Sequence, residues 1–204
     1  RLYPLHFVTL IIVALLQFLH LTTSNSFQIV MNNDIYHFIL NLFFISSWGF
    51  EKGHSFNAPI WSVSIEIAIY ILFFLLIIYL RKFKLTLVIL LSIVFLLLNK
   101  LDLNDSLFLE CARLFFSGVL VYQIISRFKN MYILSILSII LIVLSFVGNF
   151  KIHLFCPSLL LLFASSEDLI KNKKIKTFCK MSGNLTYALY LLHIPTQLLL
   201  LFII

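Results

Sequence analysis

Seven apolar runs separated by short polar segments dominate this sequence, and they constrain its fold more than any other feature. A helix of about 20 apolar residues is needed to cross the roughly 30 Å hydrocarbon core of a bilayer. With 62% hydrophobic and 11% charged residues, the chain has too few polar side chains to cover a water-soluble globule of this size. The runs are continuous and do not alternate at every second residue, which argues against a membrane barrel. We therefore predict an all-α, polytopic transmembrane helical bundle.

We predict about seven spans and one shorter apolar segment that does not cross the bilayer. The predicted spans cover residues 4–23, 60–80, 85–98, 107–125, 131–148, 152–165 and 185–204. The shorter run, 35–48, contains Asn41, Ser46 and Ser47. We expect it to be re-entrant or to lie at the interface. Residues 24–58 then form an outer segment of a single transmembrane domain that covers residues 1–204.

Lysine and arginine predict the orientation, because they are more frequent in cytoplasmic loops than in outer loops. If 35–48 does not cross, Arg1 and the basic loops 81–84, 126–130 and 166–180 all lie on one side. We expect that side to be the cytoplasm and the membrane to be a plasma membrane, as in a bacterial inner membrane. The net charge of +7 is then mainly an orientation signal and predicts no nucleic-acid partner.

One polar stripe is predicted in the segment FNAPIWSVSIEIAIY, residues 56–70. Ser62, Glu66 and Tyr70 follow one another at four-residue spacing, which places them on one face of a helix. An ionisable residue at the centre of a span costs about 2.5–3.5 kcal/mol, so it persists only with a partner or a role. Glu66 could act as an acid or base, could orient a histidine, or could be a structural acceptor between helices.

Three further residues of this segment have separate predicted roles. Pro59 suits the first turn of a helix, and the side chain of Asn57 can cap that helix. Trp61 is expected near the outer interface, where an indole ring is a common anchor.

A second polar stripe is predicted in GNLTYALYLLHIPTQ, residues 183–197. Its members lie at spacings of four, three and four residues, with Tyr187 beside them: Thr186, Tyr190, His193 and Gln197. Pro195 removes a helical hydrogen bond and frees the carbonyl oxygen of Leu191. A histidine beside a kink indicates a site or a hinge, although a lone histidine in a membrane helix is often a core residue.

Two weaker patterns complete the polar positions. Glu110 and Arg113 could form an ion pair that fixes helix packing, and Gly118 could allow close contact between helices. No H-x-x-H, H-E-x-x-H or C-x-x-C pattern occurs in the sequence, so we predict no metal site.

Four stretches of the sequence resemble acyltransferase family 3, a family of integral membrane acyltransferases. RLYPLH at 1–6 looks like the end of the family's R-x-x-R segment, and RLFFSGVLVY at 113–122 resembles its R-x-x-x-F-x-x-G-x-x-x-Y helix. FNAPIWSVSIEIAIY at 56–70 is similar to N-x-P-x-W-S-L-S-x-E-x-x-x-Y. GNLTYALYLLHIP at 183–195 is similar to S-Y-x-L-Y-L-x-H-x-P, with Thr186 where the family usually has serine.

The resemblance implies a membrane O-acyltransferase that moves an acyl group, commonly acetyl, from cytoplasmic acyl-CoA to a hydroxyl of a cell-envelope or exported glycan. Its partners would be the lipid bilayer, acyl-CoA and a carbohydrate or glycolipid acceptor, with no bound cofactor. The seven spans would be helices three to nine of the usual ten, and a re-entrant outer segment between helices three and four is also a family feature.

The family's catalytic histidine lies on its first helix, which has no counterpart in these residues. The sequence begins at Arg1 without methionine and ends at Ile204 within an apolar run. We therefore expect a piece of a longer protein that is inactive alone.

The same interpretation assigns roles to individual residues. Glu66, Tyr190 and His193 are the candidate catalytic residues, and the Arg1 guanidinium would bind CoA phosphates. The substrate path is assigned to six residues: Asn57, Trp61, Ser62, Tyr70, Arg113 and Tyr187.

Other functions remain open at this point. A flippase or transporter for a glycan or lipid would also keep ionisable residues and kinked helices at the midplane, although no inverted repeat is visible. A glycan polymerase would usually carry an outer loop rich in arginine, and 24–58 contains none. A purely structural membrane subunit would need no polar stripes.

Overall fold

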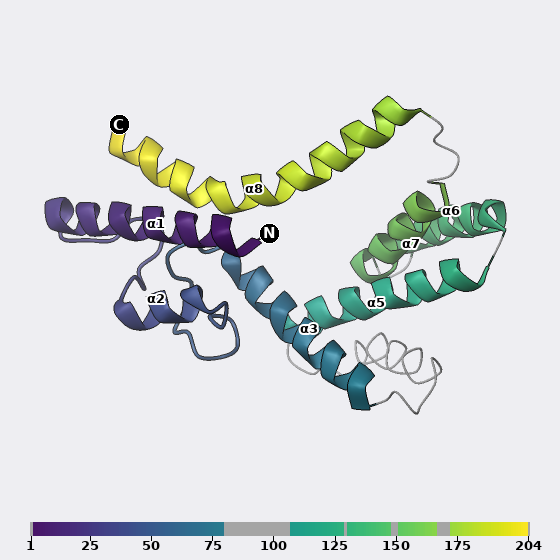
Figure 1. Ribbon diagram of the computed structural model, residues 1–204, viewed down its shortest axis with the longest axis horizontal. Helices are drawn as coiled ribbons and strands as arrows, with labels where there is room; N and C mark the ends of the chain where they lie inside the picture. The colour runs from purple at the N-terminus through teal and green to yellow at the C-terminus, as the bar shows by residue number, and fades with distance from the viewer. Residues whose placement is uncertain (1, 80–106, 129, 148–150, 167–171, 204) are drawn as a thin grey trace. The chain divides into compact units, whose positions relative to one another are not determined.

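The computed structural model is all-helical over the residues it describes, which are 2–79, 107–128, 130–147, 151–166 and 172–203 (Figure 1). Seven helices lie in these ranges: α1 (Leu2–Ser24), α2 (Ile35–Leu42), α3 (Ile60–Tyr79), α5 (Leu107–Arg127), α6 (Met131–Val147), α7 (Lys151–Ser166) and α8 (Lys173–Ile203). The prediction of an all-α fold is confirmed for this part of the chain.

Four of the described helices, α1, α3, α5 and α8, are long and apolar enough to cross a membrane. Helices α6 and α7 are apolar but shorter, with 17 and 16 residues. The predicted span 85–98 lies outside the described residues. These four helices agree with a membrane protein, whereas the predicted number of seven spans stays a prediction.

Two boundaries differ from the sequence prediction. The basic segment 166–180, predicted as a loop that could contain a short surface helix, is helical from Lys173 onward, where α8 begins and continues without a break to Ile203. The apolar run 35–48 forms a helix only as far as Leu42 and then turns, with Phe44 in a left-handed conformation at φ +58°. With eight residues, α2 is far too short to cross a bilayer.

The chain divides into two compact units, the first of which contains residues 1–70 and 177–204. One core cluster of this unit joins α1, α8 and residues near α2 through Leu10, Val13, Phe56, Ile194 and Leu198. A second cluster joins α3, α8 and the turn after α2 through Phe44, Ile60, Val63 and Leu191. The α8 residues of the two clusters, Ile194 and Leu198 in the first and Leu191 in the second, have the spacing of three and four residues that places them on one helix face.

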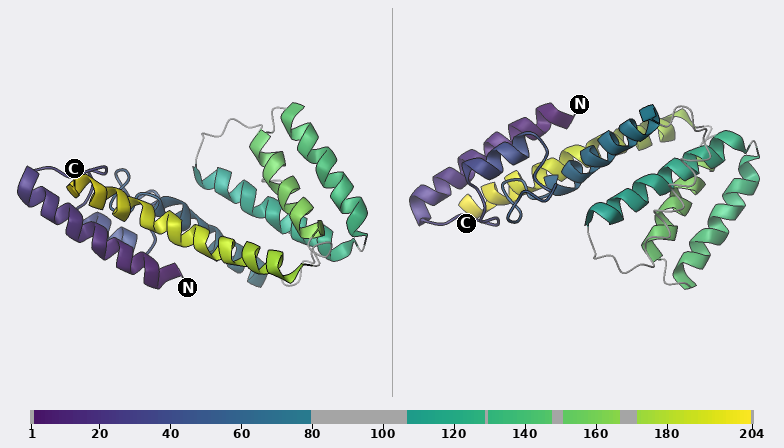
Figure 2. Two further views of the ribbon diagram at one scale, coloured as in Figure 1. Left: turned by 90° about the horizontal axis from the view of Figure 1, so that it is seen from above. Right: turned by 90° about the horizontal axis from the view of Figure 1, so that it is seen from below.

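The second unit contains residues 71–176, and its described part is built on α5, α6 and α7. Figure 2 shows these three helices as a group, with α6 and α7 side by side. Val121, Leu134 and Leu161 are the buried centre, one residue from each helix. The hydroxyls of Ser135 and Ser165 lie 2.9 Å apart and link α6 to α7.

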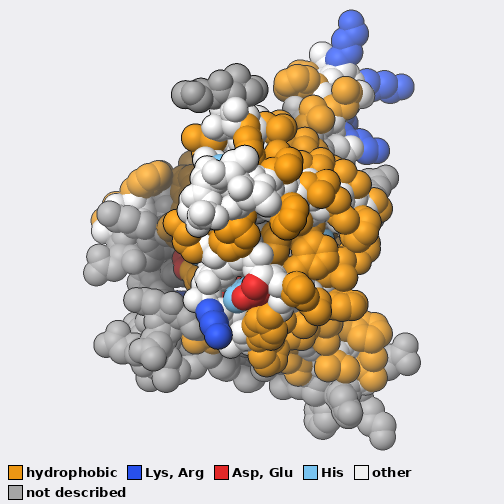
Figure 3. Space-filling model, turned by 90° about the vertical axis from the view of Figure 1, so that its left-hand side faces the viewer, with side chains coloured by type: hydrophobic (Ala, Val, Ile, Leu, Met, Phe, Trp, Pro, Cys, Tyr) orange, Lys and Arg blue, Asp and Glu red, His pale blue; other side chains and the backbone are white. Residues whose placement is uncertain are grey.

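The surface agrees with a lipid environment. Large apolar side chains are exposed on every described helix, among them Leu15, Phe74, Phe146, Phe163 and Leu189. Figure 3 shows one face of the molecule, where hydrophobic side chains cover much of the described surface and charged ones are few. In water such a surface would drive aggregation, whereas a bilayer solvates it at no cost.

Gly118 is not needed for the close helix contact that the sequence predicted. A Cβ atom built at this position would lie 3.9 Å from Leu160 Cδ2, which is an ordinary van der Waals distance. Because alanine loses less backbone freedom than glycine in a helix, Gly118→Ala should raise stability by about 0.5–1 kcal/mol. Thermal unfolding of the purified protein in detergent measures this, and a lower midpoint than that of the wild type would show that α5 and α7 need the bare backbone.

Candidate functional site

The kink residue Pro195 has the effect on its own helix that the sequence predicts. Pro195 lies inside α8, and α8 bends along its length in Figure 1. The carbonyl oxygen of Leu191, four residues earlier, accepts a hydrogen bond of 2.9 Å from the side-chain amide of Asn57. A partner 134 residues away thus satisfies the backbone group that proline leaves unpaired.

This contact also corrects the predicted role of Asn57. Its side chain was expected to cap α3, but the amide is fully buried and points to α8 and α1 instead. It lies 3.4 Å from the Thr9 hydroxyl of α1. The backbone carbonyl of Asn57 still accepts from the Ile60 N–H at 3.0 Å, so the turn before α3 is closed by the main chain.

The two predicted polar stripes meet at Ser62 and Tyr190. The Tyr190 hydroxyl donates to the Pro59 carbonyl oxygen at 2.6 Å and lies 2.8 Å from the Ser62 hydroxyl. The Ser62 hydroxyl also lies 3.3 Å from the Pro59 carbonyl oxygen, so both hydroxyls meet at this backbone group, and either one can donate to the other. The contact joins the first turn of α3 to the middle of α8, so α3 and α8 do present polar groups to each other.

One turn further along α3, Glu66 has two tyrosines near it. The Tyr70 hydroxyl donates to Glu66 Oε1. Tyr187 of α8 lies within electrostatic range of the same carboxylate and packs against the core of this unit. The Tyr187 hydroxyl is buried and makes no hydrogen bond to a described residue. Glu66 itself is half-buried, so the carboxylate lies at the rim of the α3–α8 contact and not deep inside it.

The structure does not bring every member of the second stripe into this contact. Tyr187 and Tyr190 face α3, whereas the side chains of Thr186, His193 and Gln197 are exposed. The ring of His193 makes a contact of 3.4 Å with the carbonyl oxygen of Tyr190, three residues earlier. The apolar stripe of α8 explains this, because burying Leu191, Ile194 and Leu198 turns the neighbouring His193 outward.

The remaining predicted site residues lie elsewhere. Trp61 is partly exposed at the start of α3. Arg113 is buried in the second unit, where its Nε donates to the Leu109 carbonyl oxygen at 3.2 Å. Arg1 lies outside the described residues.

A buried polar group that the sequence analysis did not predict holds α1 against the outer segment. His6 is fully buried, stacks on Phe44 with ring centroids 4.2 Å apart, and donates from Nε2 to the Asn41 carbonyl oxygen at 2.9 Å. The Asn41 amide in turn donates to the Ser55 hydroxyl at 2.7 Å. A signal for this face was available, because His6, Val13 and Gln17 recur at helical spacing within an otherwise apolar run.

Within the described ranges, no three His, Cys, Asp or Glu side chains cluster as metal ligands would. Comparison with family models, with curated proteins and with solved structures gives no match. The chemistry of the α3–α8 contact is therefore the basis for assigning a function.

Proposed function

We propose that this protein is a membrane-bound O-acyltransferase that moves an acyl group, most simply acetyl, from acyl-CoA to a hydroxyl of a cell-envelope or exported glycan. The observation that carries the proposal is the pairing of Ser62 with Tyr190, beside Glu66 and Tyr187. The sequence motifs that resemble acyltransferase family 3 contain all four residues. Two motifs distant in the sequence thus contribute to one polar contact.

In the proposed reaction an acceptor hydroxyl attacks the thioester carbonyl carbon of acyl-CoA. A C–O bond forms, the C–S bond breaks, and the hydroxyl proton passes to a base while CoA leaves as a thiol. Glu66 either accepts that proton or orients the histidine that accepts it. The hydrogen bond from the Tyr70 hydroxyl holds the Glu66 carboxylate in place. His193 is a second candidate for proton transfer, and the resemblance implies a further histidine on another helix as the principal base.

The other predicted residues have supporting roles in this proposal. Tyr190 keeps α3 and α8 in register through Pro59 and Ser62. Tyr187 offers its buried hydroxyl to the reacting groups. The substrate path would run past Asn57 and Trp61, and the role of Arg113 in it is what the resemblance implies. Arg1 and the basic loops would face the cytoplasm, where they attract the polyanionic donor, and seven spans would surround the site.

The test is donor consumption by the full-length protein in proteoliposomes supplied with acetyl-CoA and a glycan acceptor. We expect CoA release that depends on both acetyl-CoA and acceptor. A flippase or transporter, the alternative that intramembrane ionisable residues also allow, would move the glycan and leave acetyl-CoA intact. Glycan movement without CoA release would therefore replace the present proposal with that alternative.

A further inference from the structure

A mainly apolar pocket lies between the second half of α1 and the segment 24–58. Its volume is about 200 Å³, and it is open on one side. Four phenylalanines line it, namely Phe18, Phe27, Phe38 and Phe56, together with Ala14, Leu21 and Ile35. A group the size of a short stretch of acyl chain fits such a space.

Both amide side chains in the wall of this pocket form hydrogen bonds to the protein backbone. Gln17 donates to the Gln28 carbonyl oxygen at 2.6 Å and accepts from the Gln28 N–H at 3.0 Å. Asn33 donates to the Val30 carbonyl oxygen at 2.6 Å and accepts from the Phe56 N–H at 2.7 Å. These four bonds fix both amide side chains to the backbone of Gln28, Val30 and Phe56, so the wall is ordered before a ligand binds.

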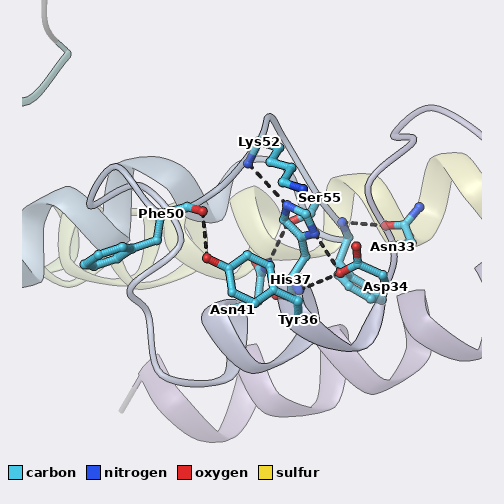
Figure 4. Close-up of polar contacts among 9 residues, drawn as sticks. Asn33, Asp34, Tyr36, His37, Asn41, Phe50, Lys52 and Ser55 are labelled. Carbon is cyan, nitrogen blue, oxygen red and sulfur yellow. Dashed lines mark hydrogen bonds and ion pairs between the residues drawn. The ribbon is translucent and has the colours of Figure 1, made fainter.

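Asp34, at the edge of the pocket, is a polar lining residue with one carboxylate oxygen available to a ligand. Its Oδ1 accepts from the backbone N–H of His37 at 2.8 Å and from His37 Nδ1 at 2.7 Å (Figure 4). The second oxygen is uncommitted to a described residue, and the side chain is 61% exposed. The bond from the His37 backbone, followed by that from its ring, lowers the pKa of Asp34 below its ordinary 3.8, so the group is anionic at neutral pH.

The groups around Asp34 fix it and add a positive charge. His37 is 1% exposed, and both nitrogens of its ring are hydrogen-bonded. The Nδ1–H donates to Asp34, and Nε2 accepts from the Lys52 N–H at 3.3 Å. Lys52 is exposed and close enough to stabilise the Asp34 carboxylate electrostatically. Figure 4 shows Asp34, His37 and Lys52 in one cluster. An anionic and a cationic group thus lie together beside an apolar pocket.

We propose that this pocket binds one phospholipid with a primary ammonium headgroup, such as phosphatidylethanolamine. The ammonium would donate to Asp34, the phosphate would lie toward Lys52, and an acyl chain would enter the pocket between the phenylalanines. Phe18 and Leu21 lie in the last two turns of the candidate span α1, which is the depth at which headgroups and chains meet. The site is independent of the proposed acyl transfer.

The test compares three lipids on the full-length protein in detergent, with native mass spectrometry as the readout. Equal amounts of phosphatidylethanolamine, phosphatidylcholine and phosphatidylglycerol are added, and the bound fractions are measured. We expect phosphatidylethanolamine to be retained about fivefold more than either of the others. Phosphatidylglycerol has no ammonium to pair with Asp34, and an exposed ion pair is worth up to about that factor. The choline group of phosphatidylcholine carries the charge but has no N–H to donate, and one lost hydrogen bond is worth about the same. Equal retention of the three lipids, or a preference for the anionic one, would overturn the proposal.

Two variants locate the site. Asp34→Asn removes the charge but keeps an oxygen for His37 and a favourable cap for α2, so we expect it to bind the three lipids equally. Glu51→Gln removes a carboxylate from the same segment outside the pocket lining and should keep the wild-type preference. If Asp34→Asn does not fold, competition on the wild type decides: lysophosphatidylethanolamine should displace the lipid and glycerophosphoethanolamine, which has no chains, should not. Displacement by the headgroup alone would rule out the apolar pocket.

Discussion

Replacing Glu66 by glutamine in the full-length protein is expected to lower acyl transfer to glycan about 100-fold, while the protein remains in the membrane at its normal level. Glutamine keeps the size of the side chain and can still accept from Tyr70, so the fold should be unaffected. The loss would come from replacing the carboxylate by an amide, because an amide can neither take a proton nor stabilise a positively charged partner. Transfer of labelled acetyl groups from acetyl-CoA to the glycan fraction measures the effect.

Glu51→Gln is the matched control, because Glu51 is a carboxylate outside the α3–α8 contact and glutamine can still accept the hydrogen bond from the Ser47 hydroxyl. It should retain transfer within a few-fold of the wild type. If Glu66→Gln transfers acetyl groups at the control rate, the Glu66 carboxylate has no part in the chemistry and serves only to hold Tyr70.

The largest expected effect on stability comes from Asn57→Leu. Leucine is close to asparagine in size, but it cannot donate to the Leu191 carbonyl oxygen that Pro195 leaves free. A buried polar group without a partner costs about 1–3 kcal/mol, so we expect the free energy of unfolding to fall by about 2 kcal/mol. Thermal or denaturant unfolding in detergent would show the loss.

A double variant separates this cause from a general packing defect. Combining Asn57→Leu with Pro195→Ala lets the N–H of residue 195 bond to the Leu191 carbonyl again, and most of the lost stability should return. Asn184→Leu, on the exposed surface of α8, should have little effect by itself. If the two changes at 57 and 195 are simply additive, the Asn57–Leu191 bond contributes little.

The sequence predicted the features that depend on local periodicity and on the cost of polar groups in a membrane. The start of α3 near Pro59, the freed Leu191 carbonyl and the polar face of α3 all follow from the spacing of residues along one helix. The contact between Ser62 and Tyr190 was expected only in general terms, because pairing of two faces across 128 residues depends on how the helices pack.

The misplaced details have physical reasons. Asn57 is a good cap by type, but a buried carbonyl acceptor on another helix outweighed the cap. His193 belongs to a polar stripe by spacing, yet the adjacent apolar stripe of α8 determined which side was buried. The burial of His6 and His37 was not predicted, because part of what holds each ring is distant in the sequence: the Asn41 carbonyl oxygen is 35 residues from His6, and the Lys52 N–H is 15 residues from His37.

The most direct measurement of the central claim is photo-crosslinking with an acyl-CoA analogue that carries the reactive group at the end of its acyl chain. The label should be recovered on peptides that contain Glu66 or Tyr187–Tyr190, and excess acetyl-CoA should prevent the labelling. Label that falls only on other helices, or that acetyl-CoA does not displace, would contradict acyl transfer at the contact between α3 and α8.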